Sequence, residues 1–333
     1  MSIYRIPLSN GTFEGDNNVY LFADGPETVL VDTGDWLGAT REQLVAGLAD
    51  RGVAPSAIDR ILLTHWHPDH TGLAGQLQAE SGATVHVHTA DAPLVAGDGR
   101  AWGEMQARQQ ALFDAWKMPA GAREALADRL GETTDREQPD PTVESFEGGD
   151  TIQVNDHELV VVHASGHAKG LCMFELSREG STEVLSSDAL LPKYTPNVGG
   201  ADVRVAQPLS AYLGALEGMI AADYDRAWPG HRAPIEHPTD RAQAIIDHHE
   251  ERAWRVLDVL SGQRATTTWE VSAALFGELE GIHILHGPGE AHAHLDHLQD
   301  AGTIVADERG YRCTPETDQA LVELDTARWP LRR

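Results

Sequence analysis

The chain has 333 residues, 41% hydrophobic and 23% charged, which is enough for one large and one smaller domain and excludes a wholly disordered chain. Asp and Glu total 52 against 25 Lys and Arg, and the resulting net charge of −27 disfavours a generic binder of DNA or anionic membranes. Only three of the basic residues are lysines. An acidic chain this poor in lysine suggests a halophilic source.

Cysteine usage and the N-terminal segment bear on the compartment. Cys172 and Cys313 lie far apart in the chain, so they form neither a metal-binding pair nor a disulfide framework. The first residues, 2–6, resemble a strand and lack the charged and apolar stretches of a signal peptide, and no apolar run approaches the roughly 18 residues of a membrane span. We therefore expect a cytoplasmic protein with no membrane partner.

Short apolar or β-branched runs predict eight further strands. These runs cover residues 19–22, 28–31, 60–63, 84–88, 157–162, 171–176, 183–185 and 226–228. Two helices are expected between them: one that Thr40 would cap, with Gln43 three positions later, and one over 71–80 that stops near Gly82. Because strands and helices alternate, we expect an α/β layered fold.

The segment from about residue 91 to residue 144 breaks this pattern. Helical stretches near 104–116 and 122–130 predict an inserted helical subdomain that could act as a lid. Trp102, Trp116 and Met118 within it could line the mouth of a pocket, or they could simply pack its helices together.

After Pro238 the chain changes character again. Thr239 would cap a long helix ending near Leu260, and a helix over 268–275, a Gly-Pro-Gly turn at 287–289, a helix over 290–300 and a hairpin over 303–314 follow. Three helices and a terminal hairpin predict a winged-helix-like domain. The expected organisation is a catalytic domain over 1–237, with its insertion at about 91–144, and this second domain over 238–333.

The strongest chemical signal lies where the strand over 60–63 gives way to a helix. Four potential metal ligands fall within six positions there: His65, His67, Asp69 and His70. In an extended backbone His65 and His67 face the same side, as two ligands of one ion should, and the other two follow just past the turn, where they could serve a second ion. Imidazoles and a carboxylate suit zinc, iron or manganese, so we expect a metal site rather than an exposed polar loop.

The His-x-His-x-Asp-His pattern at 65–70 resembles the signature of the metallo-β-lactamase fold superfamily. Four further motifs of that family follow its order, at Val29–Gly34, His163–His167, Leu185–Leu190 and Pro229–His231. The resemblance implies a four-layer αβ/βα sandwich. With its helical insertion and winged-helix-like tail, the chain is similar to the lactamase-beta-like and glyoxalase II type hydrolases.

By this resemblance, two divalent metal ions, expected to be Zn²⁺ with Fe or Mn as alternatives, would share seven ligands. One ion would be held by His65, His67 and His167, the other by Asp69, His70 and His231, with Asp188 bridging the two. The family mechanism uses a metal-bridging hydroxide as nucleophile, and Asp69 would orient it and transfer a proton as a catalytic residue. Asp32 would be a structural residue that orients the metal loop and is not a ligand.

The sequence departs from the family pattern beside the ligands. Ser165 replaces the usual proline, Ala168 and Lys169 replace the usual threonine and its neighbour, and Ser187 stands where glycine is frequent. These changes affect the surroundings of the ligands, so they bear on substrate and metal preference more than on metal binding.

Other polar residues have weaker claims to a role. Lys193 and Tyr194 follow the bridging aspartate and could bind a substrate carboxylate or phosphate, although a surface lysine on a loop is equally consistent. His249 falls on the apolar face of the long helix, which favours a packed core histidine. The tail histidines, including His292, His294 and His297, are expected mostly on the surface.

The function that fits best is hydrolysis of a thioester or ester of a small acyl substrate, by a binuclear metal-dependent hydrolase of the thioesterase or esterase type. A single-strand endoribonuclease is an alternative, but the tail from residue 240 carries 17 Asp and Glu against nine Arg, which makes nucleic acid a poor partner. A mononuclear iron persulfide dioxygenase and a vestigial regulatory protein are also consistent with parts of the pattern. The tail would then serve packing or a homodimer.

Overall fold

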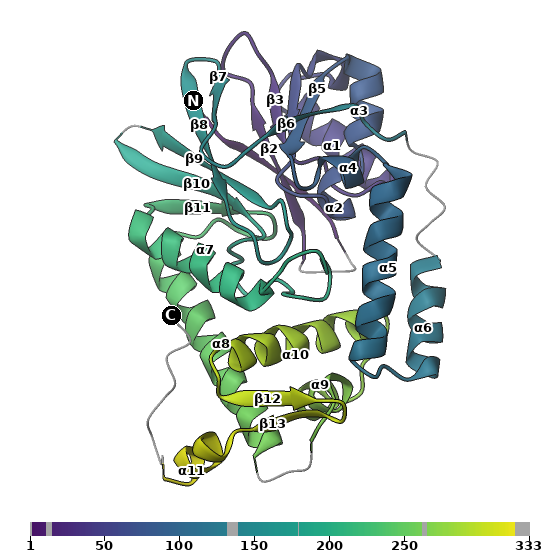
Figure 1. The fold of residues 1–333 in the computed structure, drawn as a ribbon. Helices are drawn as coiled ribbons and strands as arrows, with labels where there is room; N and C mark the ends of the chain where they lie inside the picture. Colours follow the sequence, from purple (N-terminus) through teal and green to yellow (C-terminus); the bar gives the residue numbers. More distant parts are fainter. Residues whose placement is uncertain (1, 11–14, 132–138, 179, 262–264, 324–333) are drawn as a thin grey trace. The chain divides into compact units, whose positions relative to one another are not determined.

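The protein is represented by a computed structural model that describes residues 2–10, 15–131, 139–178, 180–261 and 265–323 (Figure 1). The chain divides into two compact units. The first comprises residues 1–103, 136–196 and 215–242, and the second comprises residues 104–135, 197–214 and 243–333. The boundary expected at 237/238 stays a prediction.

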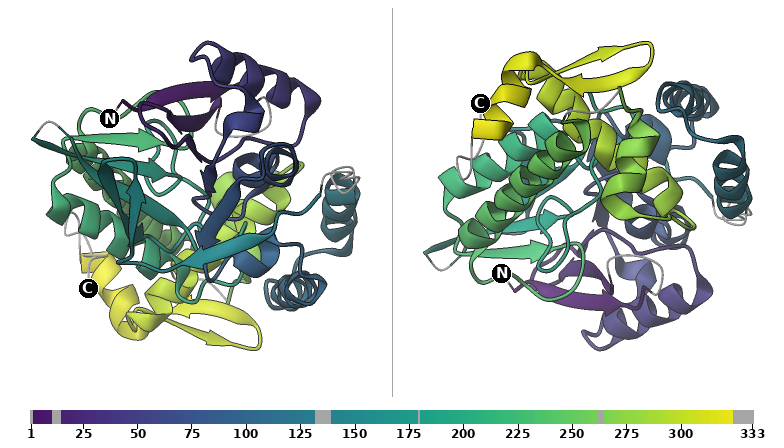
Figure 2. Two further views of the ribbon diagram at one scale, coloured as in Figure 1. Left: turned by 90° about the horizontal axis from the view of Figure 1, so that it is seen from above. Right: turned by 90° about the horizontal axis from the view of Figure 1, so that it is seen from below.

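Two sheets form the first unit, and they can be followed from above and below in Figure 2. The six-stranded sheet has the order β1 (Tyr4–Leu8), β2 (Asn17–Phe22), β3 (Val29–Val31), β4 (Arg60–Leu62), β5 (Thr84–His88) and β6 (Val143–Phe146). The pairs from β3 to β6 are parallel, while β1–β2 and β2–β3 are antiparallel. Parallel neighbours place the ends of β3, β4 and β5 at one edge of the sheet, where the ligand-bearing loop begins.

The second sheet has five strands, and all of its neighbouring pairs are antiparallel except β10 with β11. Its order is β11 (Arg226–Pro229), β10 (Ser181–Ser187), β9 (Cys172–Arg178), β8 (His157–His163) and β7 (Thr151–Val154). Loops that leave β8, β10 and β11 carry His167, Asp188 and His231. The second sheet therefore supplies the candidate ligands that are distant in sequence from the first motif.

Buried apolar side chains join the two sheets face to face. Phe22 and Val31 of the first sheet share one core cluster with Phe174 and Leu185 of the second. A second cluster lies between the first sheet and the helices α1 (Gly38–Ala49) and α3 (Ala74–Ser81). Each fully buried side chain of this size contributes about 1.5–3 kcal/mol, so these clusters hold the ligand-bearing strand ends in place.

The predicted strands are recovered, but their bounds shift and two were missed. The strand expected over 84–88 is β5, whereas β6 and β7 had no counterpart in the expectation. Each of these two has only four residues, of which only the last is buried, so any apolar pattern in them is too short to stand out.

Helix starts were predicted less well. Thr40 lies inside α1, whose N-cap is Leu37, and the Thr40 hydroxyl donates to Asp35 instead of capping the helix. The helix expected over 71–80 is two helices, the single turn α2 (Pro68–Thr71) and α3, which ends at a left-handed Gly82 as expected. Thr239 lies within α8 (Pro238–Leu260), and its hydroxyl donates to Asp223.

The remaining elements include the short helices η1 (Pro55–Ala57) and α4 (Ala92–Val95), and the long helices α5 (Gly99–Ala115), α6 (Ala120–Gly131) and α7 (Pro208–Ala222). The second unit also has α9 (Thr268–Phe276), α10 (His283–Asp300), the hairpin β12 (Ile304–Asp307) with β13 (Gly310–Cys313), and α11 (Pro315–Glu323). Phe113, Trp116 and Met118 form one apolar cluster with Ile284 and Leu285 of α10. Helix packing therefore accounts for Trp116 and Met118, and the predicted lid stays a prediction.

The expectation of a turn at 287–289 was wrong, because these residues lie inside α10. Pro288 lies in the second turn, past the first-turn positions where a proline removes no intrahelical bond, so α10 lacks the bond to the Ile284 oxygen. Gly289 packs against the backbone of Gly199 and Gly200. Within the described parts of the chain, no helix has the length and apolar character needed to cross a membrane.

Candidate metal centre

The loop after β4 gives the first four candidate ligands their geometry. His67 has extended backbone, with φ −60° and ψ 144°, and it caps α2, which has Pro68 in its first turn. The fixed φ of proline suits the start of a helix, so the chain turns here from extended to helical backbone. This change lets His65 and His67 project from the extended segment and Asp69 and His70 from the helical turn.

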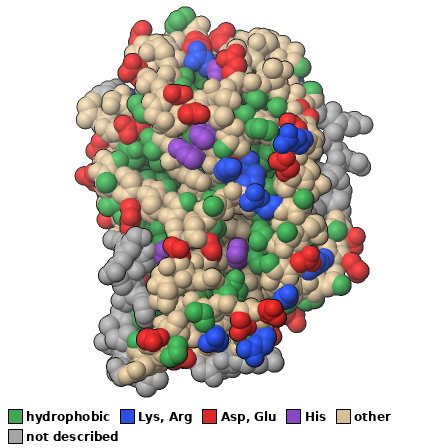
Figure 3. All heavy atoms as spheres, in the orientation of Figure 1, with side chains coloured by type: hydrophobic (Ala, Val, Ile, Leu, Met, Phe, Trp, Pro, Cys, Tyr) green, Lys and Arg blue, Asp and Glu red, His purple; other side chains and the backbone are tan. Residues whose placement is uncertain are grey.

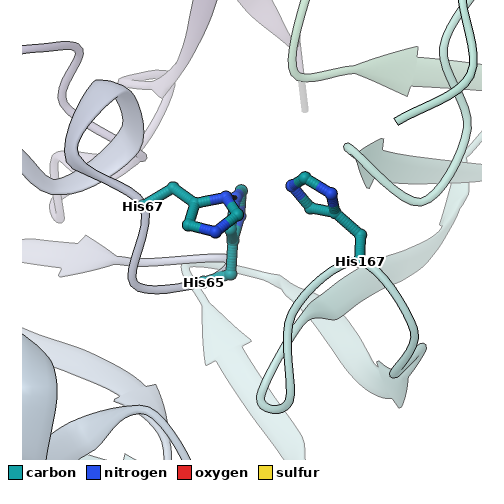
Figure 4. A group of neighbouring side chains, drawn as sticks. All are labelled: His65, His67 and His167. Atoms are coloured by element: carbon teal, nitrogen blue, oxygen red, sulfur yellow. Dashed lines mark hydrogen bonds between the residues drawn. The ribbon is translucent and has the colours of Figure 1, made fainter. Parts of the chain in front are cut away.

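The structure brings all seven predicted ligands together. Donor atoms of His65, His67 and His167 lie within 4.8 Å of one another, and so do those of His65, His70 and Asp188. The third such group is Asp69, His70 and His231. Figure 4 shows the rings of His65, His67 and His167 pointing toward one another from two separate loops.

Asp188 lies between the two histidine groups. Its Oδ2 atom is 3.6 Å from Nε2 of His167 and 3.4 Å from Nε2 of His231, and its Oδ1 atom is 3.5 Å from Nε2 of His70. Asp69 completes the second group, with Oδ2 at 3.5 Å from Nε2 of His231. This position of Asp188 is the one that a carboxylate shared by two ions requires, and its role as a ligand stays a prediction.

The charges at this site are strongly coupled. Burial lowers the pKa of His65 well below its usual value, so its imidazole is neutral near pH 7 and can donate a lone pair. Burial acts to raise the pKa of Asp188, but the neighbouring charges of His231 and His70 outweigh it and hold that pKa well below its usual value. The carboxylate is therefore ionised.

The donor set fits a metal ion. His70 Nε2 and Asp188 Oδ1 are buried, and neither makes a hydrogen bond within the described parts of the chain. Leaving such atoms buried without a partner costs about 1–3 kcal/mol each, more for a charged group. Neutral imidazoles and ionised carboxylates are ligands for zinc and similar ions, so a cation at this position would satisfy these atoms.

Asp32 contacts both ends of the segment 64–70, which carries the first four candidate ligands. Its carboxylate accepts hydrogen bonds from the backbone N–H of Thr64 at 2.9 Å and the Thr64 hydroxyl, and it lies 2.8 Å from His70 Nδ1. The contact with His70 orients that ring so that Nε2 faces the other donors. The family resemblance implies that Asp32 orients the metal loop, and its contact with His70 is consistent with that role.

Three strained residues adjoin the ligands. Asp32, Ser187 and Arg232 have φ values of 60°, 46° and 66°, in the left-handed region that disfavours side chains. Such strain persists where the surroundings fix the backbone, and it is concentrated at functional sites. Glycine would adopt the φ of Ser187 without steric cost, which fits the glycine that the family resemblance leads us to expect there.

Asn17 was missed by the sequence analysis. Its Nδ2 atom donates to both the backbone oxygen and Oδ2 of Asp69, each at 3.1 Å, and its backbone forms an isolated bridge with His231. It thus connects two members of one ligand group. No sequence signal marked it, because an asparagine at the start of a strand is ordinary.

Lys193 and Tyr194 form a small cationic cluster with Arg232, the residue after His231. The Lys193 Nζ atom and the Arg232 guanidinium carbon each lie 5.0 Å from the centre of the Tyr194 ring. Tyr194 is 46% exposed, so the cluster is open to solvent. Arg232 had not been singled out from the sequence.

The second unit contains a different histidine cluster. His249 is fully buried, as expected for a core histidine, and its Nδ1 lies 3.3 Å from Nε2 of His294. The expectation that the tail histidines lie mostly on the surface holds only in part: His294 is fully buried, His283 is exposed, and His286, His292 and His297 are partly buried. With Glu290, His249 and His294 form a further group whose donor atoms are close enough to hold a metal ion. The Glu290 carboxylate, however, already binds Arg252 at 2.7 Å.

Comparison with known proteins defines the family. Residues 12–231 match the model of the metallo-beta-lactamase superfamily, so the chain belongs to this superfamily. A structure of a metallo-beta-lactamase family protein from Thermus thermophilus is similar, with a TM-score of 0.80, 28% identity and coverage of 94% of this chain and 98% of that one. The expected α/β fold and the expectation of a hydrolase are confirmed at this level.

Two curated relatives show the range of names in the family. An atrochrysone carboxyl ACP thioesterase from Passalora fulva is 23% identical over 80% of this chain, which spans 65% of that protein's length. A beta-lactamase-like protein 2 homolog from Drosophila melanogaster is 27% identical over 74% of this chain and 68% of that protein.

Proposed function

We propose that the chain is a binuclear metal-dependent hydrolase that cleaves a thioester or ester of a small acyl substrate. The observation that carries this proposal is the convergence of seven donor residues, with Asp188 within 3.6 Å of histidines from both groups. The names of relatives that are thioesterases support the reaction class.

The ligands divide between two ions, which we take to be zinc. His65, His67 and His167 would hold one ion and Asp69, His70 and His231 the other, with Asp188 shared. When bound, such a pair supplies an activated water near neutral pH and polarises the oxygen of the scissile carbonyl.

The protein's own contribution to proton transfer would come from Asp69. Its side chain is more exposed than those of its neighbours in the site, at 14% against 1% for His70 and 6% for Asp188. Asn17 donates to its Oδ2 atom and fixes its orientation. Asp69 is therefore placed to accept a proton and return it to the leaving group.

The cationic cluster would bind an anionic part of the substrate. Lys193 and Arg232 both face the exposed ring of Tyr194, and neither has a carboxylate partner among the described residues. The chain otherwise has a large excess of acidic groups, so two unneutralised cations beside a ligand are a local exception. A carboxylate or phosphate on the acyl or leaving group would pair with them.

A substrate panel tests this proposal. Zinc-loaded protein should hydrolyse acyl thioesters or esters and leave single-stranded RNA intact. Lys193→Gln should raise KM about tenfold for a carboxylated acyl thioester and little for its uncharged analogue, because an interaction with a charge is lost. Lys117→Gln removes an exposed lysine of the second unit and is the matched control.

Two outcomes would contradict the proposed reaction, and a third would contradict only the role of the cationic cluster. Cleavage of RNA while every thioester and ester stays intact would favour the endoribonuclease. One iron per chain with oxygen consumption would favour the persulfide dioxygenase. If Lys193→Gln raises KM equally for the uncharged and the carboxylated substrate, the cluster does not bind the anionic group. The assignment of the chain as a hydrolase would stand.

The rest of the chain has a supporting part in this proposal. The three helices α8, α9 and α10 and the hairpin β12–β13 are the elements of a winged-helix-like module, which would serve packing or a homodimer. Figure 3 shows Asp and Glu side chains scattered over the viewed face, which agrees with the acid excess on which we base the proposed halophilic source. A melting temperature unchanged between low and molar salt would contradict the halophilic assignment.

A further inference from the structure

Asp91 connects the two loops that carry the three-histidine group. It is fully buried, and its Oδ2 atom accepts a hydrogen bond from the backbone N–H of Trp66 at 3.1 Å. Its Oδ1 atom accepts one from the backbone N–H of Gly170 at 3.0 Å. Trp66 lies between His65 and His67, and Gly170 follows His167 by three residues, so one carboxylate holds both loops.

The local sequence would assign this aspartate a different task. Asp91 precedes Ala92 and Pro93 at the start of α4, and an aspartate before a helix whose first turn contains proline is a typical helix cap. It does occupy the N-cap position of α4, yet its side chain makes no capping hydrogen bond. The Asp91 carboxylate therefore binds the two loops and not the first turn of α4.

The packing around Asp91 leaves little freedom for this arrangement. A Cβ atom on Gly170 would lie 2.5 Å from Cγ of Asp91, so glycine is needed for the loop to approach the carboxylate. The loop between β8 and β9 has its own closing bond from Ala164 N–H to the Leu171 oxygen. The contact with Asp91 therefore connects a closed loop to the segment that carries His65 and His67.

We propose that Asp91 is a positioning residue for the metal ion held by His65, His67 and His167. It sets the separation between the segment 65–67 and the loop that carries His167, and it does not touch the ion or the substrate. This inference rests on the proposed metal centre. The other ligand group depends on Asn17, which donates to Asp69, so the two ions have separate supports.

The test is metal affinity measured ion by ion, with metal-buffered zinc and with the visible spectrum of the cobalt-substituted protein. In Asp91→Asn, one acceptor oxygen becomes an amide donor that faces a backbone N–H, and in Asp91→Ala both acceptors are lost. We expect the affinity for one ion to fall about ten- to a hundredfold, as is typical when a residue that orients metal ligands is removed. The affinity for the second ion should change much less.

Two further variants serve as controls. Asp202 is as buried as Asp91 and pairs with Arg204 in the second unit, so Asp202→Asn should leave both affinities unchanged. Asn17→Ala should weaken the other ion, giving the opposite pattern. If Asp91→Ala does not fold, Gly170→Ala keeps the carboxylate but displaces the loop, and it should reproduce the weaker binding of one ion.

The outcomes separate this inference from the proposed function. A wild-type protein that binds no divalent metal would remove both. If the wild type binds two ions and the folded Asp91→Asn variant keeps both affinities, or weakens both equally, only the role of Asp91 is overturned.

Discussion

Two clusters of buried histidine and carboxylate side chains differ in how their charges are balanced. In the second unit, Glu290 binds Arg252 at 2.7 Å and accepts the Val198 N–H at 2.9 Å, so both of its oxygens have protein partners. In the first unit, the charged neighbours that Asp188 has within ion-pair distance, among the described residues, are all histidines.

The contrast shows that proximity and burial are not enough for a metal site. His294 donates its Nδ1 proton to the Glu290 backbone oxygen, and its Nε2 faces Nδ1 of His249, so both nitrogens of the His294 ring have protein partners. Nε2 of His249 is buried and makes no hydrogen bond within the described residues, so the difference between the clusters lies in the carboxylate and its arginine. An arginine already supplies the positive charge that Glu290 needs. In the first unit, a carboxylate and several ring nitrogens face one another with no arginine or lysine paired to Asp188 in the part of the chain that the structure describes.

The largest effect is expected from removing Asp188, the carboxylate that we propose to be shared by two ions. Asp188→Ala should lower metal content and reduce kcat/KM about a thousandfold, since several kcal/mol of charge stabilisation would be lost. Elemental analysis and a thioesterase assay measure the two effects. Glu290→Gln is the matched change in the second unit. If this variant also binds less metal than the wild type, the claim that only the cluster of the first unit binds metal would be wrong.

The second cluster should matter for stability instead. Arg252→Ala leaves Glu290 as a buried charge without its partner, and breaking such a pair typically costs about 3–5 kcal/mol. Unfolding of the second unit in denaturant measures this loss. The double variant with Glu290→Gln should recover much of it, and a loss in Arg252→Ala below about 1 kcal/mol would show that Arg252 is not the balancing charge.

A smaller effect is expected from pH. Burial, with Arg252 and the neighbouring histidines His297 and His248 adding to it, lowers the pKa of His294 to about 3. In the unfolded chain the His294 imidazole binds a proton near pH 6.5, whereas in the folded chain it stays neutral. The free energy of unfolding therefore falls as pH drops below about 6.5. Between about pH 6.5 and pH 5 the loss is roughly 2 kcal/mol.

His294→Gln provides the control for this pH dependence. The variant should be less stable at neutral pH but should show a shallower decline toward acid, measured by denaturant unfolding at each pH. Burial raises the pKa of Glu290, an effect of opposite sign that remains in the variant. An unchanged slope would mean that His294 does not control the pH dependence.

The seven residues that the sequence proposed as ligands lie together in the structure, and their role as ligands stays a prediction. His65, His67, Asp69 and His70 fall close together in the chain, and motif order added His167, Asp188 and His231 as candidates. Asn17 and Asp91 could not be found in this way, because their roles depend on loops 52 and 79 residues distant. Asp91 even carried a local signal for a different role, that of a helix cap.

Element boundaries failed for a similar reason. A local pattern predicted Thr40 as a cap and 287–289 as a turn. The helix instead begins before Thr40, whose hydroxyl bonds the nearby Asp35, and the distant Gly200 packs against Gly289. The strands β6 and β7 were missed because each has only four residues: β6 has no apolar alternation, and the alternation of Ile152 and Val154 in β7 covers too short a run to stand out.

The most direct test of the central claim is the metal stoichiometry of the purified full chain, measured by elemental analysis alongside His67→Ala. The account predicts close to two zinc ions per chain in the wild type and a clear loss in the variant. A wild-type chain that binds no divalent metal, or a single iron that His67→Ala does not affect, would contradict it.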